Sequence, residues 1–283
     1  MSDPKIVLLT GSTAGIGQEA ARQLAAQGHT LVLVARSEPK AQALAEELKQ
    51  SSGNDAHGYL VGDLSRPAEV RQVAQAFRER HERLDVLFNN AGALFTDRQL
   101  TPDGFERTTA VNHLAYFVLT TELLDLLQAS KGRVVSTASD AHHQGDLGYL
   151  DDLQNERWGV GGMRAYGRSK LANIWFTREL ARRVEGSGAT ATCFHPGFVA
   201  SDFARNNGFL ATVAMIVTRP FQRSVTKGAD TGVWLATSDE AAGQNGGYYH
   251  NRKLGRLSKA ARDPDAPATL WAKTEALLAG VSA

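Results

Sequence analysis

Short apolar runs alternate with longer amphipathic runs over most of the chain. Residues 5–9 form the first apolar run, and residues 15–27 follow with apolar positions at helical spacing before Gly28. A short apolar run is typical of a buried strand, whereas apolar positions three and four residues apart are typical of a helix packed on one side. The remaining pattern predicts strands at 30–35, 56–61, 84–88, 133–137, 190–194 and 247–250, and helices at 38–50, 68–80, 103–129, 164–184 and 229–238.

This alternation of strands and helices predicts an α/β protein with a doubly wound parallel sheet. A strand can pair in parallel with a neighbour only after a crossover connection, and the crossover helices cover both faces of the sheet. The pattern contains about seven strands flanked by helices. No linker rich in proline, glycine or serine divides the sequence, so we expect residues 1–283 to form a single domain.

Two segments interrupt the alternation. Residues 140–162 are rich in Gly, His and Asp, and residues 198–227 mix apolar residues with Arg and Asn. Each follows a predicted strand, which places both at the carboxyl ends of the strands, where open α/β sheets bind ligands. Irregular segments of this length are commonly lids or binding loops. For residues 198–227, both a helix that covers the core and an apolar lid over a lipophilic substrate stay open.

Composition narrows the class of protein further. The chain has 283 residues, and its 31 Lys and Arg residues nearly balance its 30 Asp and Glu residues, so the charge does not favour nucleic acid as a partner. The single cysteine, Cys193, excludes an internal disulfide and lies in an apolar run, which favours a buried and inert thiol. No apolar stretch is long enough for a secretory signal or a membrane span, so we expect a cytoplasmic protein.

A glycine-rich turn follows the first predicted strand and opens directly into a helix. Gly11 can make the sharp exit from the strand, Gly15 lets the backbone approach a diphosphate, and Gly17 lets the helix pack closely on the sheet. The helix N-terminus adds N–H groups and partial positive charge. The spacing differs from the dinucleotide fingerprint G-x-G-x-x-G and from a P-loop. We nevertheless expect a nucleotide site, with contacts from Gly11, Ser12, Thr13, Gly15, Ile16 and Gly17.

The end of the second predicted strand indicates which nucleotide binds. NAD-binding proteins of this kind usually carry an acid here for the ribose 2′-hydroxyl, whereas an Arg accommodates a 2′-phosphate. Arg36 occupies this place, so we expect NADP(H) to be preferred through charge complementarity. Glu38 lies two residues further on, so NAD(H) stays possible.

A Tyr-x-x-x-Lys pair opens the helix predicted at 164–184. Tyr166 and Lys170 are four residues apart, so their side chains share one helix face. A tyrosine with a pKa of about 10 transfers protons poorly at neutral pH, and a neighbouring ammonium lowers that pKa by favouring the phenolate. Such pairs are also common on solvated helix faces. Ser139, in the polar loop after another predicted strand, could bind a substrate oxygen beside the pair.

The joint occurrence of these motifs resembles the classical short-chain dehydrogenase/reductase family, whose members have a Rossmann fold. The matching residues are Thr10, Gly11, Gly15 and Gly17, Asp63-Leu64, Asn89-Asn90-Ala91-Gly92, Asn112, Ser139, Tyr166 and Lys170, and His195-Pro196-Gly197. Residues 101–106, 111–114, 141–143 and 169–173 look like the retinol dehydrogenase-like branch. Members of that branch often carry an N-terminal membrane anchor, and we expect none here.

The resemblance implies a role for each residue of the site. Tyr166 would protonate the carbonyl oxygen or act as the base in reverse, and Lys170 would lower its pKa and bind the nicotinamide ribose. Ser139 would hold the substrate oxygen with His142 as a further substrate contact, and Asn112 would distort its helix and hold a water in a proton relay. Besides Arg36 and the glycine-rich turn, the implied cofactor contacts are Asp63, Leu64, Asn90, Ala91, Gly92, Tyr166, Lys170, Pro196, Gly197 and Val199. The cofactor-binding part would be about 1–137, and the catalytic and substrate-binding part about 138–283.

These observations predict an NADP(H)-dependent oxidoreductase that interconverts a lipophilic aldehyde or ketone and its alcohol. Two alternatives stay open: a non-catalytic dinucleotide-sensing protein on the same fold, and a double-bond reductase of the same family. No metal is expected, because the adjacent His142 and His143 cannot easily converge on one ion. A homodimer or homotetramer formed through the long predicted helices is compatible with the resemblance.

Overall fold

The computed structural model describes residues 3–157, 162–197 and 224–280. The strands in these ranges form one sheet in the order β3-β2-β1-β4-β5-β6-β7-β8. Their bounds are β1 Ile6–Thr10, β2 Thr30–Ala35, β3 Gly58–Val61, β4 Val86–Asn89, β5 Arg133–Thr137, β6 Thr190–Phe194, β7 Tyr248–His250 and β8 Lys253–Leu254. The first seven are parallel, as predicted, and β8 adds a short antiparallel edge.

The helices lie between the strands in the order that the pattern predicts. They are α1 Gly15–Ala26, α2 Glu38–Ser52, α3 Pro67–Arg78, α4 Arg107–Thr109, α5 Ala115–Glu122, α6 Leu124–Ala129, α7 Gly162–Arg183, α9 Val225–Thr237 and α10 Ala266–Ala279. The single helix predicted at 103–129 is wrong: its first turn starts only at Arg107, where Glu106 caps the N–H groups of Thr108 and Thr109. α10 is not among the predicted elements. None of the described helices combines the length and apolarity of a membrane span.

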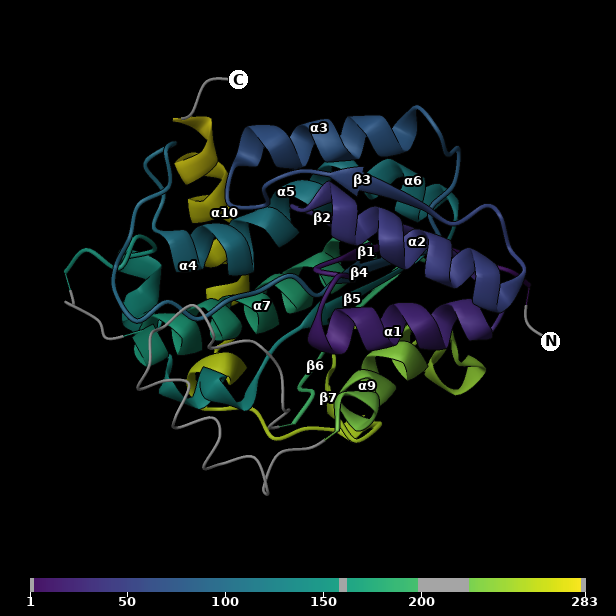
Figure 1. The fold of residues 1–283 in the computed structure, drawn as a ribbon. Coiled ribbons are helices and arrows are strands. Elements are labelled where there is room, and N and C mark those ends of the chain that lie inside the picture. The colour runs from purple at the N-terminus through teal and green to yellow at the C-terminus, as the bar shows by residue number, and fades with distance from the viewer. Residues whose placement is uncertain (1–2, 158–161, 198–223, 281–283) are drawn as a thin grey trace.

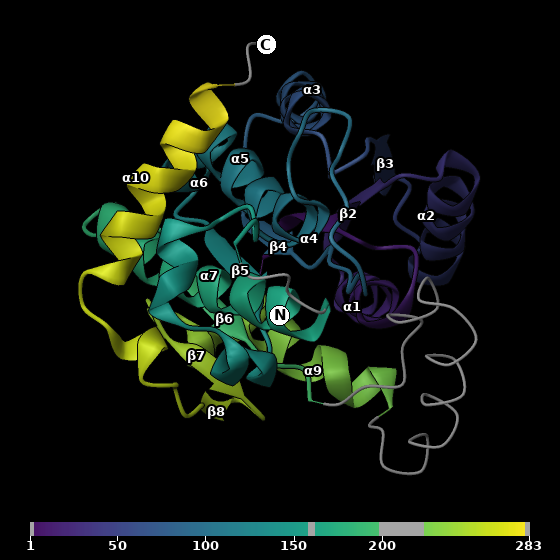
Figure 2. The ribbon, with the colours of Figure 1, turned by 90° about the vertical axis from the view of Figure 1, so that its left-hand side faces the viewer.

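Helices cover both faces of the sheet (Figures 1 and 2). Along β1, Val7 and Leu9 point to one face and Leu8 to the other, and all three are fully buried, as the alternation of side chains in a strand requires. The face of Val7 and Leu9 is covered by α1, α2 and α9, and the face of Leu8 by α3, α5, α7 and α10. This is the doubly wound α/β arrangement that the sequence predicts.

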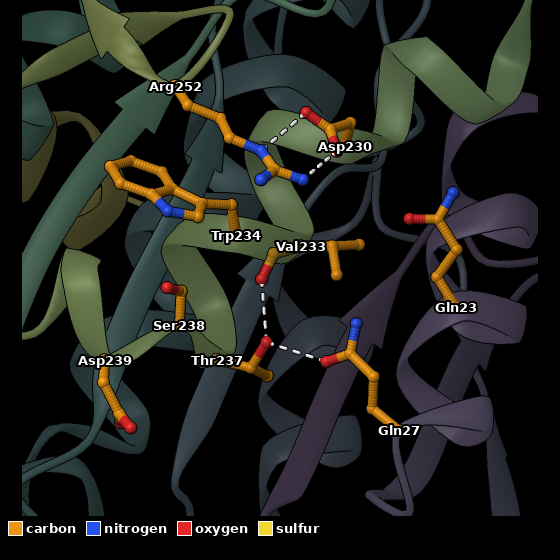
Figure 3. A pocket seen from close by; sticks show the side chains of 9 residues that line it. All are labelled: Gln23, Gln27, Asp230, Val233, Trp234, Thr237, Ser238, Asp239 and Arg252. Atoms are coloured by element: carbon orange, nitrogen blue, oxygen red, sulfur yellow. Dashed lines mark hydrogen bonds and ion pairs between the residues drawn. The ribbon is translucent and has the colours of Figure 1, made fainter.

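A polar groove of about 360 Å³ lies along α1 and α9 (Figure 3). Its lining groups already bond one another: the Arg252 guanidinium pairs with Asp230, and the Thr237 hydroxyl donates to Gln27 at 2.9 Å. None of the predicted site residues lines this groove.

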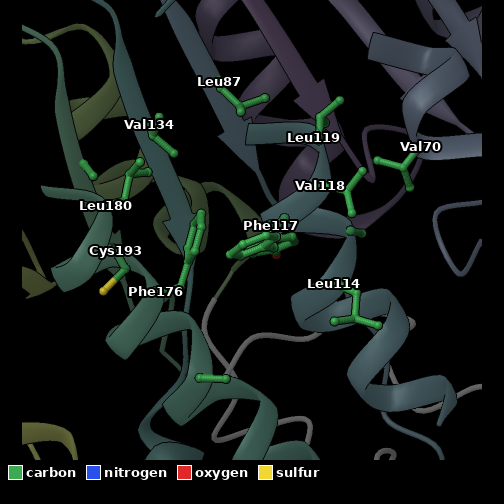
Figure 4. Close-up of a cluster of buried hydrophobic side chains, with 14 of the residues drawn as sticks. Val70, Leu87, Leu114, Phe117, Val118, Leu119, Val134, Phe176, Leu180 and Cys193 are labelled. Carbon is green, nitrogen blue, oxygen red and sulfur yellow. The ribbon is translucent and has the colours of Figure 1, made fainter. Parts of the chain in front are cut away.

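The opposite face contains the larger core, in which α5 and α7 pack against the strands (Figure 4). The ring centres of Phe117 and Trp271 are 4.7 Å apart, and those of Phe176 and Trp271 are 5.8 Å apart, so α10 docks on both helices through one indole. Cys193 lies fully buried in this core, and burial raises its pKa to about 12. The expected inert thiol is confirmed.

The strand order reverses between β1 and β4, and this reversal positions the site. Chain segments leaving the carboxyl ends of β1 and β4 turn to opposite sides of the sheet, which opens a crevice between them. The glycine-rich turn follows β1, and Asn90, Ala91 and Gly92 follow β4. The predicted cofactor residues therefore meet at the place where such sheets bind dinucleotides.

Candidate active site

The glycine-rich turn is shaped by contacts that leave no space for side chains. Gly11 has φ of +64° and Gly15 has φ of +53°, a backbone region that favours glycine. A Cβ atom on Gly17 would lie 2.2 Å from the Gly11 carbonyl oxygen and 2.5 Å from Asn90 Nδ2. Gly17 thus lets α1 approach the turn. The Ser12 side chain is fully buried and donates to the Val34 carbonyl at 3.4 Å.

The N-terminus of α1 is open to an anion. Its capping residue, Ala14, offers no side-chain acceptor, and the first turn contains no acidic residue. The N–H groups at a helix start lack partners within the helix and carry partial positive charge. This end of α1 can therefore accept a diphosphate without displacing a capping side chain of its own.

Thr10 connects the glycine-rich turn to the end of β4. Its hydroxyl accepts from the N–H groups of Asn90 and Ala91 at 2.9 and 3.0 Å. The Asn90 amide returns two bonds, to the carbonyls of Thr10 and Gly11 at 3.1 and 3.2 Å. These bonds fix the two sides of the crevice relative to each other. They also commit the Asn90 amide nitrogen to the protein.

Arg36 is exposed at the end of β2, and within the described ranges no hydrogen bond or ion pair engages its side chain. The neighbouring Glu38 carboxylate accepts instead from the Tyr59 hydroxyl at 3.4 Å. Asp63 lies at the end of β3, where its carboxylate accepts from the N–H of Ser65 at 2.9 Å, and Leu64 beside it is buried. The guanidinium of Arg36 is therefore available to a phosphate.

Asn112 lies in the middle of a π-helical turn, Ala110–Leu114, that joins α4 to α5. Its amide bonds both backbone groups of one residue: Oδ1 accepts from Ala93 N at 2.8 Å, and Nδ2 donates to Ala93 O at 2.9 Å. Nδ2 also donates to the Ser169 hydroxyl on α7 at 3.0 Å. π-helical turns are rare and are frequent at functional sites. This one aims Asn112 at the segment beside Gly92.

Lys170 is buried at the base of the crevice. Its ammonium donates to the Thr137 carbonyl at 2.9 Å, and a Cβ atom on Gly92 would lie 3.3 Å from its Nζ atom. Burial lowers the pKa of Lys170 to about 7, because removal from water disfavours the charged form. The Nζ atom lies 5.5 Å from the centre of the Tyr166 ring.

Tyr166 and Ser139 share a hydrogen bond between their side chains. The Ser139 hydroxyl also accepts from Ala141 N at 3.2 Å, so its own hydrogen points toward Tyr166 or toward a bound oxygen. Burial raises the pKa of Tyr166 above its usual value of 10.0, and the bond from Ser139 lowers it in part. Burial therefore outweighs the predicted effect of Lys170 on the Tyr166 pKa in this structure.

The structure does not support a substrate contact by His142. The His142 side chain is fully buried, and both ring nitrogens bond backbone groups, the Ser139 carbonyl at 2.8 Å and Ser258 N at 3.1 Å. In this structure His142 contacts the loop that carries Ser139, and its role as a substrate contact stays a prediction. Pro196 and Gly197 follow β6 and are half-buried, whereas Val199 and residues 198–223 lie outside the described ranges.

One group of potential metal ligands occurs among the described residues, at Asp140, His142 and His143. The His142 nitrogens already bond backbone groups, and the Asp140 carboxylate accepts from the Tyr248 hydroxyl at 3.1 Å. A cation would have to displace these bonds. The group gives no support to a metal site.

A buried arginine beside Tyr166 and Lys170 was not predicted as part of the site. Arg168 is fully buried on α7, where it bonds the Asn155 side chain at 3.1 Å and the Asp146 carboxylate at 3.3 Å. Asn155 in turn donates to the buried Glu106 at 3.2 Å. This network holds the segment at 140–157 on the helix of Tyr166. The only signal in the sequence is that a charged residue stands within the Tyr-x-x-x-Lys motif.

Comparisons with known proteins agree with this geometry. The family model of short chain dehydrogenases matches residues 5–150, about half of the chain. A putative daunorubicin C-13 ketoreductase from Streptomyces sp. strain C5 is 39% identical over 269 residues, which cover 94% of this chain and 90% of that protein. Human retinol dehydrogenase 12 is 36% identical over 268 residues, covering 94% of this chain and 84% of that protein.

The chain belongs to the short-chain dehydrogenase/reductase family. Like its relatives, it is an oxidoreductase that acts on the alcohol and carbonyl pair. The fold agrees: an uncharacterised protein from Mycobacterium paratuberculosis superposes with a TM-score of 0.75 at 30% identity over 96% of this chain and 92% of that one. A short chain dehydrogenase from Burkholderia cenocepacia in complex with NADP gives a TM-score of 0.69 at 26% identity, over 92% and 98%.

The residues of this dehydrogenase/reductase fit a nicotinamide dinucleotide. The uncapped start of α1 suits the diphosphate, and the glycine turn leaves the backbone accessible to it. Lys170 bonds the carbonyl at the end of β5, and Arg36, which no group of the described ranges engages, follows β2, so the two lie on either side of the reversal between β1 and β4. The family and the NADP-bound neighbours support the binding of a nicotinamide dinucleotide by this protein.

Proposed function

We propose that the protein is an NADP(H)-dependent enzyme that interconverts a lipophilic aldehyde or ketone and its alcohol, with Tyr166 as the general acid and base. The observation that carries this proposal is the convergence of three groups at one end of the sheet. The Tyr166 and Ser139 hydroxyls bond each other, and the Lys170 ammonium lies 5.5 Å from the Tyr166 ring. Two hydroxyls held this way can both bond one substrate oxygen.

The proton moves between Tyr166 and that oxygen. In the direction of reduction, the Ser139 hydroxyl donates a hydrogen bond to the carbonyl oxygen, and Tyr166 transfers its proton to that oxygen. Bound NADPH would supply the hydride. The phenolate left on Tyr166 is stabilised by the nearby Lys170. Because the pKa of Lys170 is about 7, its ammonium form is available near neutral pH and is further favoured as the phenolate forms.

Arg36 supports the choice of NADP(H). Its exposed guanidinium has no partner in the described ranges and follows β2, where a 2′-phosphate is bound in this type of fold. Similar solved structures include complexes with NADP, among them one of RhlG from Pseudomonas aeruginosa with a TM-score of 0.69 at 27% identity, over 86% of this chain and 93% of that one.

The names of the relatives support a lipophilic substrate. One relative is named for the ketone at C-13 of daunorubicin and others for retinol, which is an apolar alcohol. We further propose that the enzyme acts in the cytoplasm as a homodimer or homotetramer. Its single buried thiol is compatible with a reducing compartment, and the mass of the native particle tests the oligomeric state.

Oxidation of NADPH and of NADH with a panel of aliphatic, aromatic, steroid and retinoid carbonyls tests the proposal. Tyr166→Phe should lower kcat by at least about a hundredfold, because the proton donor is lost. Tyr116→Phe is the matched control, since the Tyr116 ring also lies 5.7 Å from Lys170 Nζ but is fully buried. It should retain turnover within a few-fold of the parent.

Three other results would contradict the proposal. NADPH binding without turnover of any carbonyl would favour the dinucleotide-sensing alternative. Hydride transfer to activated double bonds, with none to carbonyls, would favour the double-bond reductase. Equal losses in Tyr166→Phe and Tyr116→Phe would contradict the assignment of the proton donor.

A further inference from the structure

Both ring nitrogens of the buried His142 bond backbone groups, one as an acceptor and the other as a donor. Nε2 lies 3.1 Å from the backbone N–H of Ser258 and must accept, so Nδ1, 2.8 Å from the Ser139 carbonyl, carries the hydrogen and donates. Burial also lowers the pKa of His142, which favours the neutral ring that this pattern requires. The tautomer is therefore fixed by two backbone groups 116 and three residues away in sequence.

These bonds join the loop of Ser139 to the C-terminal part of the chain. Ser258 stands between β8 and α10, beyond the residues that the family model matches. The same loop is held by Asp140, whose carboxylate accepts from Tyr248 at 3.1 Å and whose N–H donates to His195 Nδ1 at 3.3 Å. The Ser139 carbonyl itself accepts two bonds from His142, one from its backbone N–H at 3.0 Å and one from its ring at 2.8 Å.

We propose that His142 is a positioning residue for Ser139. Ser139 has extended backbone (φ −164°, ψ 155°) where β5 gives way to a 3₁₀ turn, so its hydroxyl direction depends on what holds its peptide groups. The Nδ1 hydrogen of His142 gives the Ser139 carbonyl a second bond beside that from the His142 backbone N–H, and the bond to Ser258 prevents the ring from turning. The inference rests on the proposed role of Ser139 in binding the substrate oxygen.

Two substitutions separate the two bonds of His142. The amide of Asn reaches the position of Nδ1, so His142→Asn can still donate to the Ser139 carbonyl but loses the bond to Ser258. The amide of Gln reaches the position of Nε2, so His142→Gln can still accept from Ser258 but loses the bond to Ser139. His143→Asn is the matched control, because His143 is exposed and its ring lies tilted beside that of His142 with ring centres 4.2 Å apart.

The expected result is a loss in kcat that follows the bond to Ser139. His142→Gln should lower kcat about 10- to 100-fold with the KM for NADPH changed less than about threefold, while His142→Asn keeps kcat within about threefold. His143→Asn should leave both constants unchanged. In a Ser139→Ala background, His142→Gln should cause no further loss, because its effect passes through Ser139.

Other results would overturn the inference. Equal kcat values for the Asn and Gln variants, or a Gln effect that persists undiminished in Ser139→Ala, would show that His142 acts only on general stability. If the parent turns over no carbonyl, the proposed function fails, and hydrogen exchange at the amides of residues 139–145 then decides the positioning role separately. Faster exchange in His142→Gln than in His142→Asn supports it, and identical exchange overturns it.

Discussion

The two ends of the crevice are built by different means. At the turn after β1, the shape comes from the absence of side chains, with Gly17 against the Gly11 carbonyl and an uncapped helix start. At the end of β5, the shape comes from side chains that bond backbone or one another, such as Lys170 on the Thr137 carbonyl. The first end presents N–H groups to a ligand, and the second presents side-chain hydroxyls and an ammonium.

This difference separates two kinds of sensitivity. A site made of backbone tolerates changes in its neighbours as long as no atom is added, because its bonds, such as those of Thr10 and Asn90, join uncharged groups. A site made of buried polar side chains fails when a partner is removed, because the remaining group stays in the interior without compensation. We call the end at the glycine turn the cofactor end and the end at β5 the proposed catalytic end. Substitutions that add atoms should damage the cofactor end, and substitutions that remove buried charges should damage the proposed catalytic end.

The largest effect is expected at Arg168. Arg168→Met should lower the free energy of unfolding by about 3–5 kcal/mol, because the buried Asp152 carboxylate, 3.9 Å from the guanidinium, would lose its counter-charge and Asn155 would lose a hydrogen bond. Denaturant unfolding at neutral pH measures this loss. Arg164→Met is the matched control, since Arg164 bonds the same Asp146 carboxylate at 3.0 Å but is largely exposed. The control should lower the free energy of unfolding by only about 0.5 kcal/mol. Equal losses in the two variants would contradict the expectation that the buried arginine contributes more than the exposed one.

The second effect tests the cofactor end. Gly17→Ala should lower the free energy of unfolding by about 2 kcal/mol and weaken NADPH binding more than about tenfold, because the added Cβ would meet the Gly11 carbonyl at 2.2 Å. Gly58→Ala is the control, since a Cβ there meets nothing within 4 Å. Calorimetric titration of NADPH with both variants measures the difference. Unchanged NADPH affinity in Gly17→Ala would show that the turn can shift to accommodate the added methyl group.

The same contrast explains what the sequence predicts and what it does not. The glycine turn, Arg36, and the spacing of Tyr166 and Lys170 are local features, so residues close together in the chain were sufficient to predict them. The seven parallel strands were predicted for a similar reason, since each is a short apolar run. Whether Ser139, Tyr166 and Lys170 perform the chemistry stays a proposal.

Other features depend on pairing between distant residues. The sequence does not show that Arg168 bonds Asn155, or that His142 bonds Ser258 across 116 positions. The helix predicted at 103–129 was wrong at its start because Glu106, an acid within the pattern, caps Thr108 and Thr109 instead of continuing the helix. α10 was missed, and its docking depends on Trp271 meeting rings from α5 and α7.

The third effect is a pH dependence at the proposed catalytic end. His113, next to Asn112, is fully buried, and burial lowers its pKa from 6.5 to about 4. Above pH 6.5 both states hold a neutral ring, so this shift contributes nothing. As the pH falls from 6.5 toward 4, the unfolded chain takes up a proton that the folded protein does not, and stability decreases.

Between about pH 7 and pH 5 this loss should reach about 2 kcal/mol. Denaturant unfolding across that range, with the parent and His113→Gln compared, isolates the contribution from those of other histidines. Gln can keep the bond to the Thr274 hydroxyl that His113 Nε2 makes at 3.0 Å, but it does not titrate. The variant should lack that part of the slope, and identical slopes would contradict the assignment to His113.

The smallest effect separates the two cofactors and tests the cofactor end without adding atoms. Arg36→Ala should raise the KM for NADPH about tenfold, equivalent to about 1.4 kcal/mol, and leave the KM for NADH nearly unchanged, because only NADPH carries a 2′-phosphate. Lys40→Ala is the control, because it removes a neighbouring exposed charge from α2 and should change both values little. A fall in NADPH affinity of the same size in both variants would mean that general positive charge, and not the position of Arg36, attracts the phosphate. No change in either variant would mean that the phosphate is bound elsewhere, and the cofactor end would then depend on backbone alone.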